Sequence, residues 1–205
     1  MSAVAGTDRH GYFDALYGDN DDPYALRTRW YELRKRNALL AALPKARYRA
    51  GYEPGCGAGE LTAALAPRCD ALLASDFNDG ALTAARVRVA GLTNVRVQKH
   101  DLPADWPHAQ GPFDLIVLSE VGYFLDADAM RAVARACRDS LDADGTLVAC
   151  DWRRDFDARV LPTDTVHALL SDLGLERLVR HEEDDFLLQV WSRDARSVAE
   201  QEGIR

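Results

Sequence analysis

Segments with strand-like and helix-like spacing of hydrophobic residues alternate along the chain from about residue 48 to residue 192. Short apolar runs typical of buried strands precede longer segments whose apolar residues recur every three or four positions, as on one face of a helix. The run 113–119, Phe-Asp-Leu-Ile-Val-Leu-Ser, is apolar on both faces, which is typical of a central strand in a covered parallel sheet. The pattern predicts strands over 48–53, 70–76, 94–99, 113–119, 146–151, 175–181 and 186–192, and helices over 59–66, 78–90, 126–141 and 163–173.

Repeated strand–helix–strand units imply a parallel sheet with helices on both faces. Only the four residues 182–185 separate the last two predicted strands, whereas a parallel crossover needs a dozen or more residues. We therefore predict a Rossmann-like, doubly wound α/β fold over 48–192, with a mostly parallel sheet and an antiparallel last strand. No repeat or low-complexity linker divides the chain, so residues 1–205 are predicted to form a single domain.

A further helix is predicted ahead of this core, within an N-terminal extension over residues 1–43. Asp22-Pro23 is a typical helix start, because an acidic residue can cap the first N–H groups and proline suits the first turn. Near-helical spacing of apolar residues continues to about Leu43, so we expect a helix over 23–43. Residues 1–10 are expected to be loose.

The charge balance argues against nucleic acid as a partner. The formal net charge is −8, whereas proteins that bind a phosphate backbone carry basic faces. The four cysteines are scattered, without a CxxC motif or a cluster with histidine, so we predict no metal site and no disulfides but reduced thiols in the cytoplasm. No apolar run approaches the ~18–20 residues of a membrane span, and the polar first ten residues predict no signal peptide.

Three glycines at alternate positions lie between the first predicted strand and its helix, in Glu53-Pro54-Gly55-Cys56-Gly57-Ala58-Gly59. Glycine allows backbone angles that are closed to other residues, and it lets a ligand lie against the main chain. The free N–H groups at the helix start are expected to face that ligand. An ordinary strand-to-helix turn could look the same, so other features must decide.

Acidic residues at the ends of neighbouring strands supply the second feature. Ligands of such sheets bind at the carboxyl ends of the strands, where this sequence has Glu53, Asp76, Asp101 and Glu120. A carboxylate after the second strand suits the two hydroxyls of a ribose. The G-x-G-x-G spacing differs from the G-x-G-x-x-G that supports a pyrophosphate, and Glu53 would repel one. S-adenosylmethionine (SAM) has a sulfonium, an ammonium and a ribose but no phosphate, and it suits this pattern better than a dinucleotide.

The glycine turn, Asp76, Asp101 and Phe113-Asp114-Leu115-Ile116 together resemble the motif set of class I SAM-dependent methyltransferases, over about residues 48–151. The segments 118–125, 68–70, 166–167, 185–188 and 197–199 are similar to the nodulation-type (NodS) N-methyltransferases, which methylate an amino group of a lipo-chitooligosaccharide precursor. The resemblance implies the class I methyltransferase fold, SAM as methyl donor and S-adenosyl-L-homocysteine (SAH) as product.

The resemblance also implies roles for individual residues. Gly55, Cys56, Gly57 and Gly59 would pass close to the methionine part of SAM, with Glu53 near its ammonium. Asp76 would bind the ribose, Phe77 and Leu102 would lie beside the adenine, Asp101 would accept from its amino group, and Glu120 and Val121 would lie beneath the sulfonium. In many small methyltransferases a segment like 23–43 covers the cofactor. Its candidate contacts, unless they only pack or lie in solvent, are Tyr24, Tyr31, Arg34 and Lys35.

An amine acceptor arrives largely as an ammonium and must lose a proton before it attacks the methyl group. Glu120, Asp151 and His167 are the candidate proton acceptors, and Tyr123 could orient the acceptor. The acceptor is expected to be a small molecule or a saccharide, and the protein a monomer or homodimer. Three alternatives stay open: an O-methyltransferase, a nicotinamide- or flavin-dependent oxidoreductase, and a SAM-binding protein without catalysis.

Overall fold

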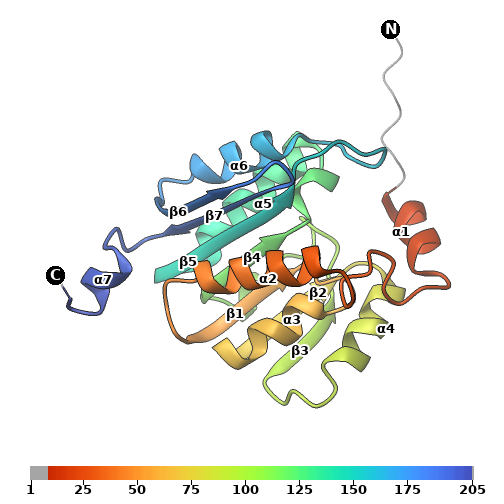
Figure 1. Ribbon diagram of the computed structural model, residues 1–205, viewed down its shortest axis with the longest axis horizontal. Coiled ribbons are helices and arrows are strands. Elements are labelled where there is room, and N and C mark those ends of the chain that lie inside the picture. Colours follow the sequence, from red (N-terminus) through yellow and green to blue (C-terminus); the bar gives the residue numbers. More distant parts are fainter. Residues whose placement is uncertain (1–8, 205) are drawn as a thin grey trace, which may run out of the picture.

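The computed structural model describes residues 9–204, and its seven strands join one sheet. The strand order is β3-β2-β1-β4-β5-β7-β6, so the chain reverses its progress across the sheet between β1 and β4 (Figure 1). Ligands of such sheets bind beside this switch point. The strands are β1 (Tyr48–Pro54), β2 (Cys69–Asp76), β3 (Val95–Lys99), β4 (Phe113–Ser119), β5 (Leu141–Trp152), β6 (Glu176–Glu182) and β7 (Phe186–Ser192).

β7 breaks the parallel arrangement of the sheet. Strands β1 to β5 pair in parallel, whereas β7 lies antiparallel between β5 and β6. The connection 183–185 between β6 and β7 is too short for a parallel crossover. The prediction of a Rossmann-like, mostly parallel sheet with an antiparallel last strand is confirmed.

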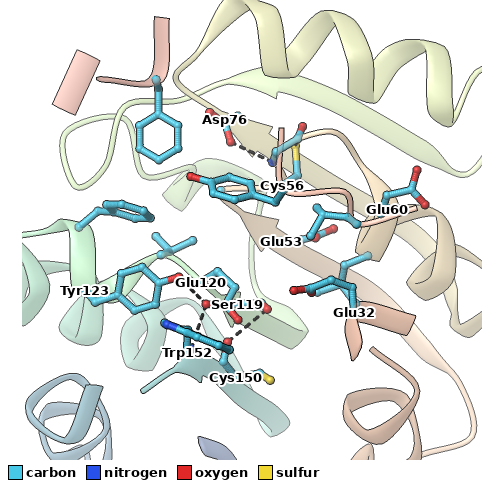
Figure 2. A pocket seen from close by; sticks show the side chains of 18 of the residues that line it. Glu32, Glu53, Cys56, Glu60, Asp76, Ser119, Glu120, Tyr123, Cys150 and Trp152 are labelled. Atoms are coloured by element: carbon cyan, nitrogen blue, oxygen red, sulfur yellow. Dashed lines mark hydrogen bonds between the residues drawn. The ribbon is translucent and has the colours of Figure 1, made fainter. Parts of the chain in front are cut away.

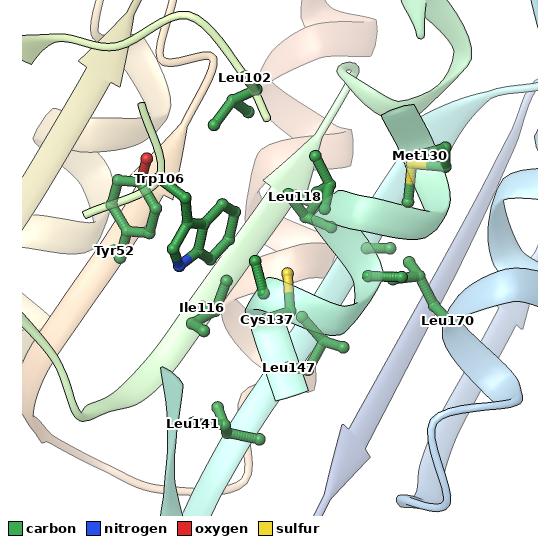
Figure 3. Packing of buried hydrophobic residues seen from close by; sticks show 14 of the residues in the cluster. Tyr52, Leu102, Trp106, Ile116, Leu118, Met130, Cys137, Leu141, Leu147 and Leu170 are labelled. Atoms are coloured by element: carbon green, nitrogen blue, oxygen red, sulfur yellow. The ribbon is translucent and has the colours of Figure 1, made fainter. Parts of the chain in front are cut away.

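Helices cover both faces of the sheet, with α2 and α3 on one face and α5 and α6 on the other (Figure 1). Leu115 of β4 packs in one cluster with Leu39 of α2, whereas Ile116 packs with Met130 and Leu170 on the opposite face (Figure 3). This two-sided burial explains why 113–119 is apolar on both faces. The helices are α1 (Arg9–Tyr17), α2 (Trp30–Ala42), α3 (Glu60–Leu65), α4 (Asp79–Arg88), α5 (Ala127–Ser140), α6 (Thr163–Ser171) and α7 (Val198–Gln201), with short 3₁₀ turns η1 (Ala66–Arg68), η2 (His108–Gln110) and η3 (Gly122–Phe124).

The helix ahead of the core begins later than the sequence predicted. The Asp22 carboxylate accepts hydrogen bonds from the N–H groups of Leu26 (2.8 Å) and Arg27 (3.1 Å), whereas an N-cap residue accepts from the N–H two or three positions on. Ala25 has a left-handed φ of 55°, which a right-handed helix cannot contain. The continuous helix is α2, so the predicted helix is wrong over 23–29.

The N-terminal extension contains a helix that was not predicted. Arg9 and His10, which were expected to be loose, open α1, and residues 1–8 lie outside the described part of the chain. None of the helices within residues 9–204 is both long and apolar enough to cross a membrane.

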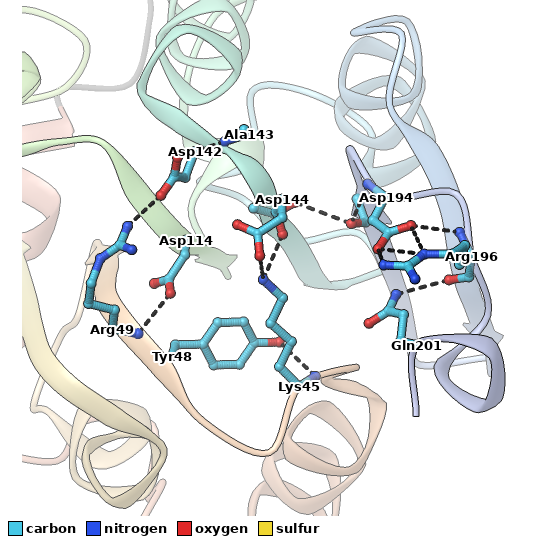
Figure 4. A network of polar contacts seen from close by, with 12 residues as sticks. Lys45, Tyr48, Arg49, Asp114, Asp142, Ala143, Asp144, Asp194, Arg196 and Gln201 are labelled. Atoms are coloured by element: carbon cyan, nitrogen blue, oxygen red, sulfur yellow. Dashed lines mark hydrogen bonds and ion pairs between the residues drawn. The ribbon is translucent and has the colours of Figure 1, made fainter. Parts of the chain in front are cut away.

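Polar contacts hold the amino ends of the central strands together (Figure 4). Asp114 of β4 accepts hydrogen bonds from the N–H groups of Arg49 (2.7 Å) and Ala50 (2.8 Å) in β1. Lys45, between α2 and β1, donates to the carboxylate of Asp144 in β5 at 2.6 Å. Asp114 therefore joins two strands at the end opposite to the one where the sequence places a ligand.

Candidate active site

A cavity of about 470 Å³ lies at the carboxyl ends of the strands, beside the switch point (Figure 2). Glu53 at the end of β1, Asp76 at the end of β2 and Glu120 after β4 all line it. The helices α1 and α2 supply aromatic and charged side chains to the rest of the wall. These are Arg9, Tyr12, Phe13 and Tyr17 from α1, and Tyr31, Glu32, Lys35, Arg36 and Leu39 from α2.

Two glycines of the turn are required by close packing within the protein. Gly55 lines the cavity with a φ of +71°, and a Cβ there would lie only 2.3 Å from a methyl carbon of Val121. Gly59 has a φ of +81° and does not line the cavity; a Cβ there would lie 3.0 Å from the Cα of Ala85 in α4. Gly59 therefore allows helix packing, and its expected contact with the methionine part is not supported.

The N–H groups of the turn are already used within the protein. Cys56 donates to the carbonyl of Ser75 at 2.9 Å, Gly57 donates to the Asp76 carboxylate at 3.0 Å, and Gly59 donates to the carbonyl of Cys56 at 2.9 Å. These three N–H groups are therefore not available to a ligand, and the expectation that the free N–H groups of the helix start face the ligand concerns α3, which begins at Glu60. Cys56 lines the cavity as a neutral thiol, because burial raises its pKa.

Glu53 is a buried acid without a full set of partners. Its side chain is 3% exposed, and its Oε2 atom has no hydrogen-bond partner among the described residues. Burial raises the pKa of Glu53 to about 8, and the nearby Asp76 adds to the shift. A cationic group in the cavity would satisfy this oxygen and favour the carboxylate.

Asp76 is fixed by the backbone on both of its oxygens. One oxygen accepts the N–H of Gly57 and the other accepts the N–H of Asn78, both at 3.0 Å. Burial raises the pKa of Asp76, and these hydrogen bonds oppose the rise. Each carboxylate oxygen keeps a further lone pair with which it can accept a hydroxyl from a ligand in the cavity.

The wall next to Asp76 is built by Phe77 and by α1. The Arg9 guanidinium lies 4.7 Å from the centre of the Phe77 ring and pairs with the Asp101 carboxylate. His10 also lies 3.1 Å from Asp101. Phe77 and Leu102 line the cavity, whereas Asp101 does not. Asp101, the predicted hydrogen-bond acceptor for the adenine amino group, is therefore paired with residues of α1 and does not reach the cavity.

Glu120 is the most constrained acid of the cavity. It has a left-handed φ of 60°, which is uncommon for a residue with a side chain. One carboxylate oxygen accepts from the Lys35 ammonium at 2.6 Å, and the other accepts from the Tyr123 hydroxyl and from the Trp152 N–H at 3.0 Å (Figure 2). Burial alone would lower the pKa of Lys35, but Glu120 and Glu32 outweigh burial and raise it. Glu120 and Lys35 therefore form a fixed ion pair.

Asp151 and His167, two predicted proton acceptors, do not line the cavity. They are 1% and 3% exposed, and the His167 Nε2 atom lies 3.1 Å from the Asp151 carboxylate while its Nδ1 atom lies 2.8 Å from the Gln189 side chain. Side chains alternate along a strand, so Trp152 faces the cavity and Asp151 faces α6. The prediction that Asp151 and His167 face an acceptor is corrected.

The covering helix contributes differently from residue to residue. Arg34 points away from the cavity and pairs with Glu183 at 2.6 Å. Tyr31 lines the cavity at its Glu120 end, with its ring 5.6 Å from that of Trp152 and 5.2 Å from the Lys35 ammonium. Tyr24 precedes the helix and also lines the cavity.

Several wall residues were missed in the sequence: Tyr12, Phe13, Tyr17 and Phe156. The aromatic stretch 11–17 was the available signal, but nothing local in the sequence indicates that it folds over the strand ends.

A sequence profile of the methyltransferase domain family matches residues 52–145. Nodulation protein S of Bradyrhizobium diazoefficiens is 31% identical over 166 residues, which cover 78% of this chain and 78% of that protein. The chain belongs to the class I SAM-dependent methyltransferases.

Two crystal structures extend the similarity of this methyltransferase to known proteins. A Pseudomonas syringae protein crystallised as a candidate methyltransferase is 47% identical, with a TM-score of 0.72 over 80% of this chain and 99% of that one. The N-methyltransferase NodS of Bradyrhizobium japonicum, in complex with SAH, is 27% identical, with a TM-score of 0.76 over 89% of this chain and 97% of that one. The resemblance to NodS is confirmed, SAM is the methyl donor, and the oxidoreductase alternative is not supported.

The cavity of this methyltransferase fits SAM in two observable respects. Gly55 presents main chain without a side chain to the cavity, and the unpartnered Glu53 oxygen suits the ammonium of the donor. The acid at Asp76 suits a ribose, and the N–H groups of Cys56, Gly57 and Gly59 are bonded within the protein and not free for a pyrophosphate. The chemistry of these groups agrees with an amino-acid sulfonium.

Proposed function

We propose that this methyltransferase methylates an amino group of a small-molecule or saccharide acceptor. The observation that carries the proposal is the Glu120 carboxylate, which is fixed at the end of β4 next to Val121 and therefore beside the Gly55 turn. In the ion-pair cluster that includes Glu120, the two carboxylates of Glu32 and Glu120 share one cation, Lys35. An excess of negative charge favours an acceptor that arrives as an ammonium. The structurally similar NodS of Bradyrhizobium japonicum is an N-methyltransferase, which supports the same class of reaction for this protein.

The residues at the other end of the cavity would hold the donor. Glu53 would pair with its ammonium, Asp76 would accept from its ribose, and Phe77 and Leu102 would flank its adenine. Arg29 is an exposed cation that lines the cavity, so we assign it to the methionine carboxylate. Bound SAM supplies an activated methyl group on its sulfonium, and the protein then contributes mainly position and orientation.

The fixed Glu120 would orient the acceptor nitrogen. Its oxygens already accept from Lys35, Tyr123 and the Trp152 N–H, so it is a poor site for storing a further proton. Burial, and then the Glu120 charge, raises the pKa of the Tyr123 hydroxyl, so Tyr123 stays protonated at neutral pH and holds Glu120. The amine would therefore react from its neutral fraction, after losing its proton to solvent, and the predicted role of Glu120 as a general base becomes one of orientation.

A screen of acceptors tests this function. Purified protein is incubated with SAM and a panel of primary and secondary amines, amino sugars and matched alcohols, and SAH release is measured. We expect turnover with amines and none with the alcohols of the same carbon skeleton. Turnover with alcohols only would replace N-methylation by O-methylation. Tight SAH binding without turnover on any acceptor would favour the non-catalytic alternative.

The cytoplasmic location and the oligomeric state remain predictions.

A further inference from the structure

The Glu120 end of the cavity is enclosed by aromatic rings. This aromatic end consists of Tyr24, Tyr31, Tyr123, Phe124, Trp152 and Phe156, which all line the cavity. The rings touch in an edge-to-face manner: Tyr31 meets Trp152 at 5.6 Å and 88°, and Tyr123 meets Phe156 at 5.3 Å and 79°. Edge-to-face pairs expose ring faces and edges to a ligand while they support one another.

The charged side chains around the aromatic end are already engaged with the protein. Lys35 lies between Glu32 (3.0 Å) and Glu120 (2.6 Å). Arg159 lies 4.7 Å from the Tyr123 ring centre and donates through Nη2 to the carbonyls of Trp152 and Arg154. Its buried Nε atom has no hydrogen-bond partner within residues 9–204, but Arg159 does not line the cavity. These groups hold the pocket in shape and leave little hydrogen-bonding capacity for the many hydroxyls of a sugar ring.

Two hydroxyls of cavity-lining residues also lack a regular hydrogen-bond partner. The Oη atoms of Tyr24 and Tyr31 are buried, and neither has a hydrogen-bond partner of normal geometry within residues 9–204, although Tyr12 lies beside Tyr24. A buried polar atom is normally hydrogen-bonded, so two orphans in one cavity wall point to a ligand that supplies the partners. An amine offers N–H groups for two such acceptors, and its charge is attracted by aromatic faces.

We propose that the acceptor of this enzyme is an amine carried on an apolar, ring-bearing scaffold, with the Tyr31 hydroxyl as a specificity-determining contact for the amine. The inference rests on the N-methylation proposed above and narrows it. An amino sugar would bury more hydroxyls than the two unpartnered tyrosine hydroxyls of this wall can hydrogen-bond, which is costly. An amino acid would bring a carboxylate close to Glu32 and Glu120, and like charges repel.

Three acceptors of similar size test the scaffold: 2-phenylethylamine, glucosamine and phenylalanine. The measured quantity is kcat/KM from SAH release, and SAH affinity is measured in parallel by calorimetry. We expect 2-phenylethylamine to exceed the other two by about tenfold or more. A preference for glucosamine or phenylalanine would overturn the apolar scaffold and leave N-methylation intact. No turnover on any of the three, with SAH still bound, would overturn both.

The variant Tyr31→Phe tests the hydroxyl, and Tyr48→Phe is its control. Tyr48 is also buried, but its hydroxyl accepts from the Lys45 N–H at the amino ends of the strands, away from the cavity. We expect Tyr31→Phe to raise KM for 2-phenylethylamine by about fivefold to tenfold, the usual effect of one lost hydrogen bond, without changing SAH affinity. Tyr48→Phe should leave both constants unchanged. An unchanged KM in Tyr31→Phe would overturn the role of its hydroxyl.

Discussion

Lys35 of α2 and Glu120 after β4 form an ion pair of 2.6 Å that ties the covering helix to the end of a central strand. Lys35 is 7% exposed although lysine is rarely buried, and its second partner, Glu32, lies 3.0 Å away. The pair fixes the acid nearest the Gly55 turn and orients the helix that supplies Tyr31. The position of helix α2 and the position of the Glu120 carboxylate are therefore coupled through this ion pair.

Removing this cation should weaken both the fold and the reaction. In Lys35→Met, two carboxylates face each other without a counter-ion, so we expect a loss of about 1–3 kcal/mol in the free energy of unfolding. Acceptor KM should rise because Glu120 loses its fixed position. Arg34→Met, which removes an exposed pair with Glu183 one residue away, is the control and should change neither quantity. Equal behaviour of the two variants in denaturant titrations and kinetics would contradict this role.

Glu120→Gln should separate turnover from donor binding. The substitution keeps the shape of the side chain but removes the charge that attracts and orients the acceptor. We expect kcat/KM for the acceptor to fall about tenfold or more, while the Kd of SAH changes by less than about threefold. Steady-state kinetics and calorimetry on the same preparation measure the two effects. An equal loss in both would place Glu120 in the donor site only.

Asp76→Ala should weaken SAH binding by roughly 1–3 kcal/mol, because ribose hydroxyls would lose a buried acceptor. A matched control exists in Asp114, which also accepts two backbone N–H groups but lies at the opposite ends of the strands. Asp114→Ala should lower Tm and leave SAH affinity unchanged at temperatures where the variant is folded. If Asp76→Ala binds SAH as the wild type does, Asp76 is not the ribose acid.

SAH binding should release a proton through Glu53. Its pKa of about 8 means that the unliganded carboxyl is mostly protonated at pH 7, and a ligand ammonium would lower that pKa and expel the proton. Calorimetry in buffers of different ionisation enthalpy should show about one proton released per SAH at pH 7, and none in Glu53→Gln. Proton uptake, or equal release in the variant, would argue against the Glu53–ammonium pair.

The same pKa shift sets the pH dependence of the unliganded fold. Because the folded state holds the Glu53 proton that the unfolded state releases, this group makes stability fall as pH rises from about 4.5 to about 8. SAH at saturating concentration should remove that dependence.

The sheet was predictable because its information is local. Apolar runs such as 113–119 and the short 182–185 connection report burial and strand direction without any long-range contact. The acids Glu53, Asp76 and Glu120 were found for the same reason: a strand's carboxyl end faces the ligand side wherever the strand lies in a parallel sheet.

The wrong predictions for Asp151 and Asp101 depended on contacts between distant segments. Asp151 follows a strand as Glu120 does, but the alternation of β5 turns it toward α6, and that face is fixed by pairing with β4 and β7. The Asp101 carboxylate pairs with Arg9 of α1, which lies 92 positions earlier in the chain, and does not line the cavity. The φ of Ala25, which delays α2, has no signature in its residue type.

The transfer of a trideuterated methyl group tests the central claim most directly. The protein is incubated with SAM that carries a CD₃ group and with 2-phenylethylamine or glucosamine, and the product is fragmented in a mass spectrometer. We predict that the acceptor gains one CD₃ group and that fragmentation locates it on nitrogen. A label on oxygen, or no labelled product from protein that binds SAH tightly, would contradict an N-methyltransferase.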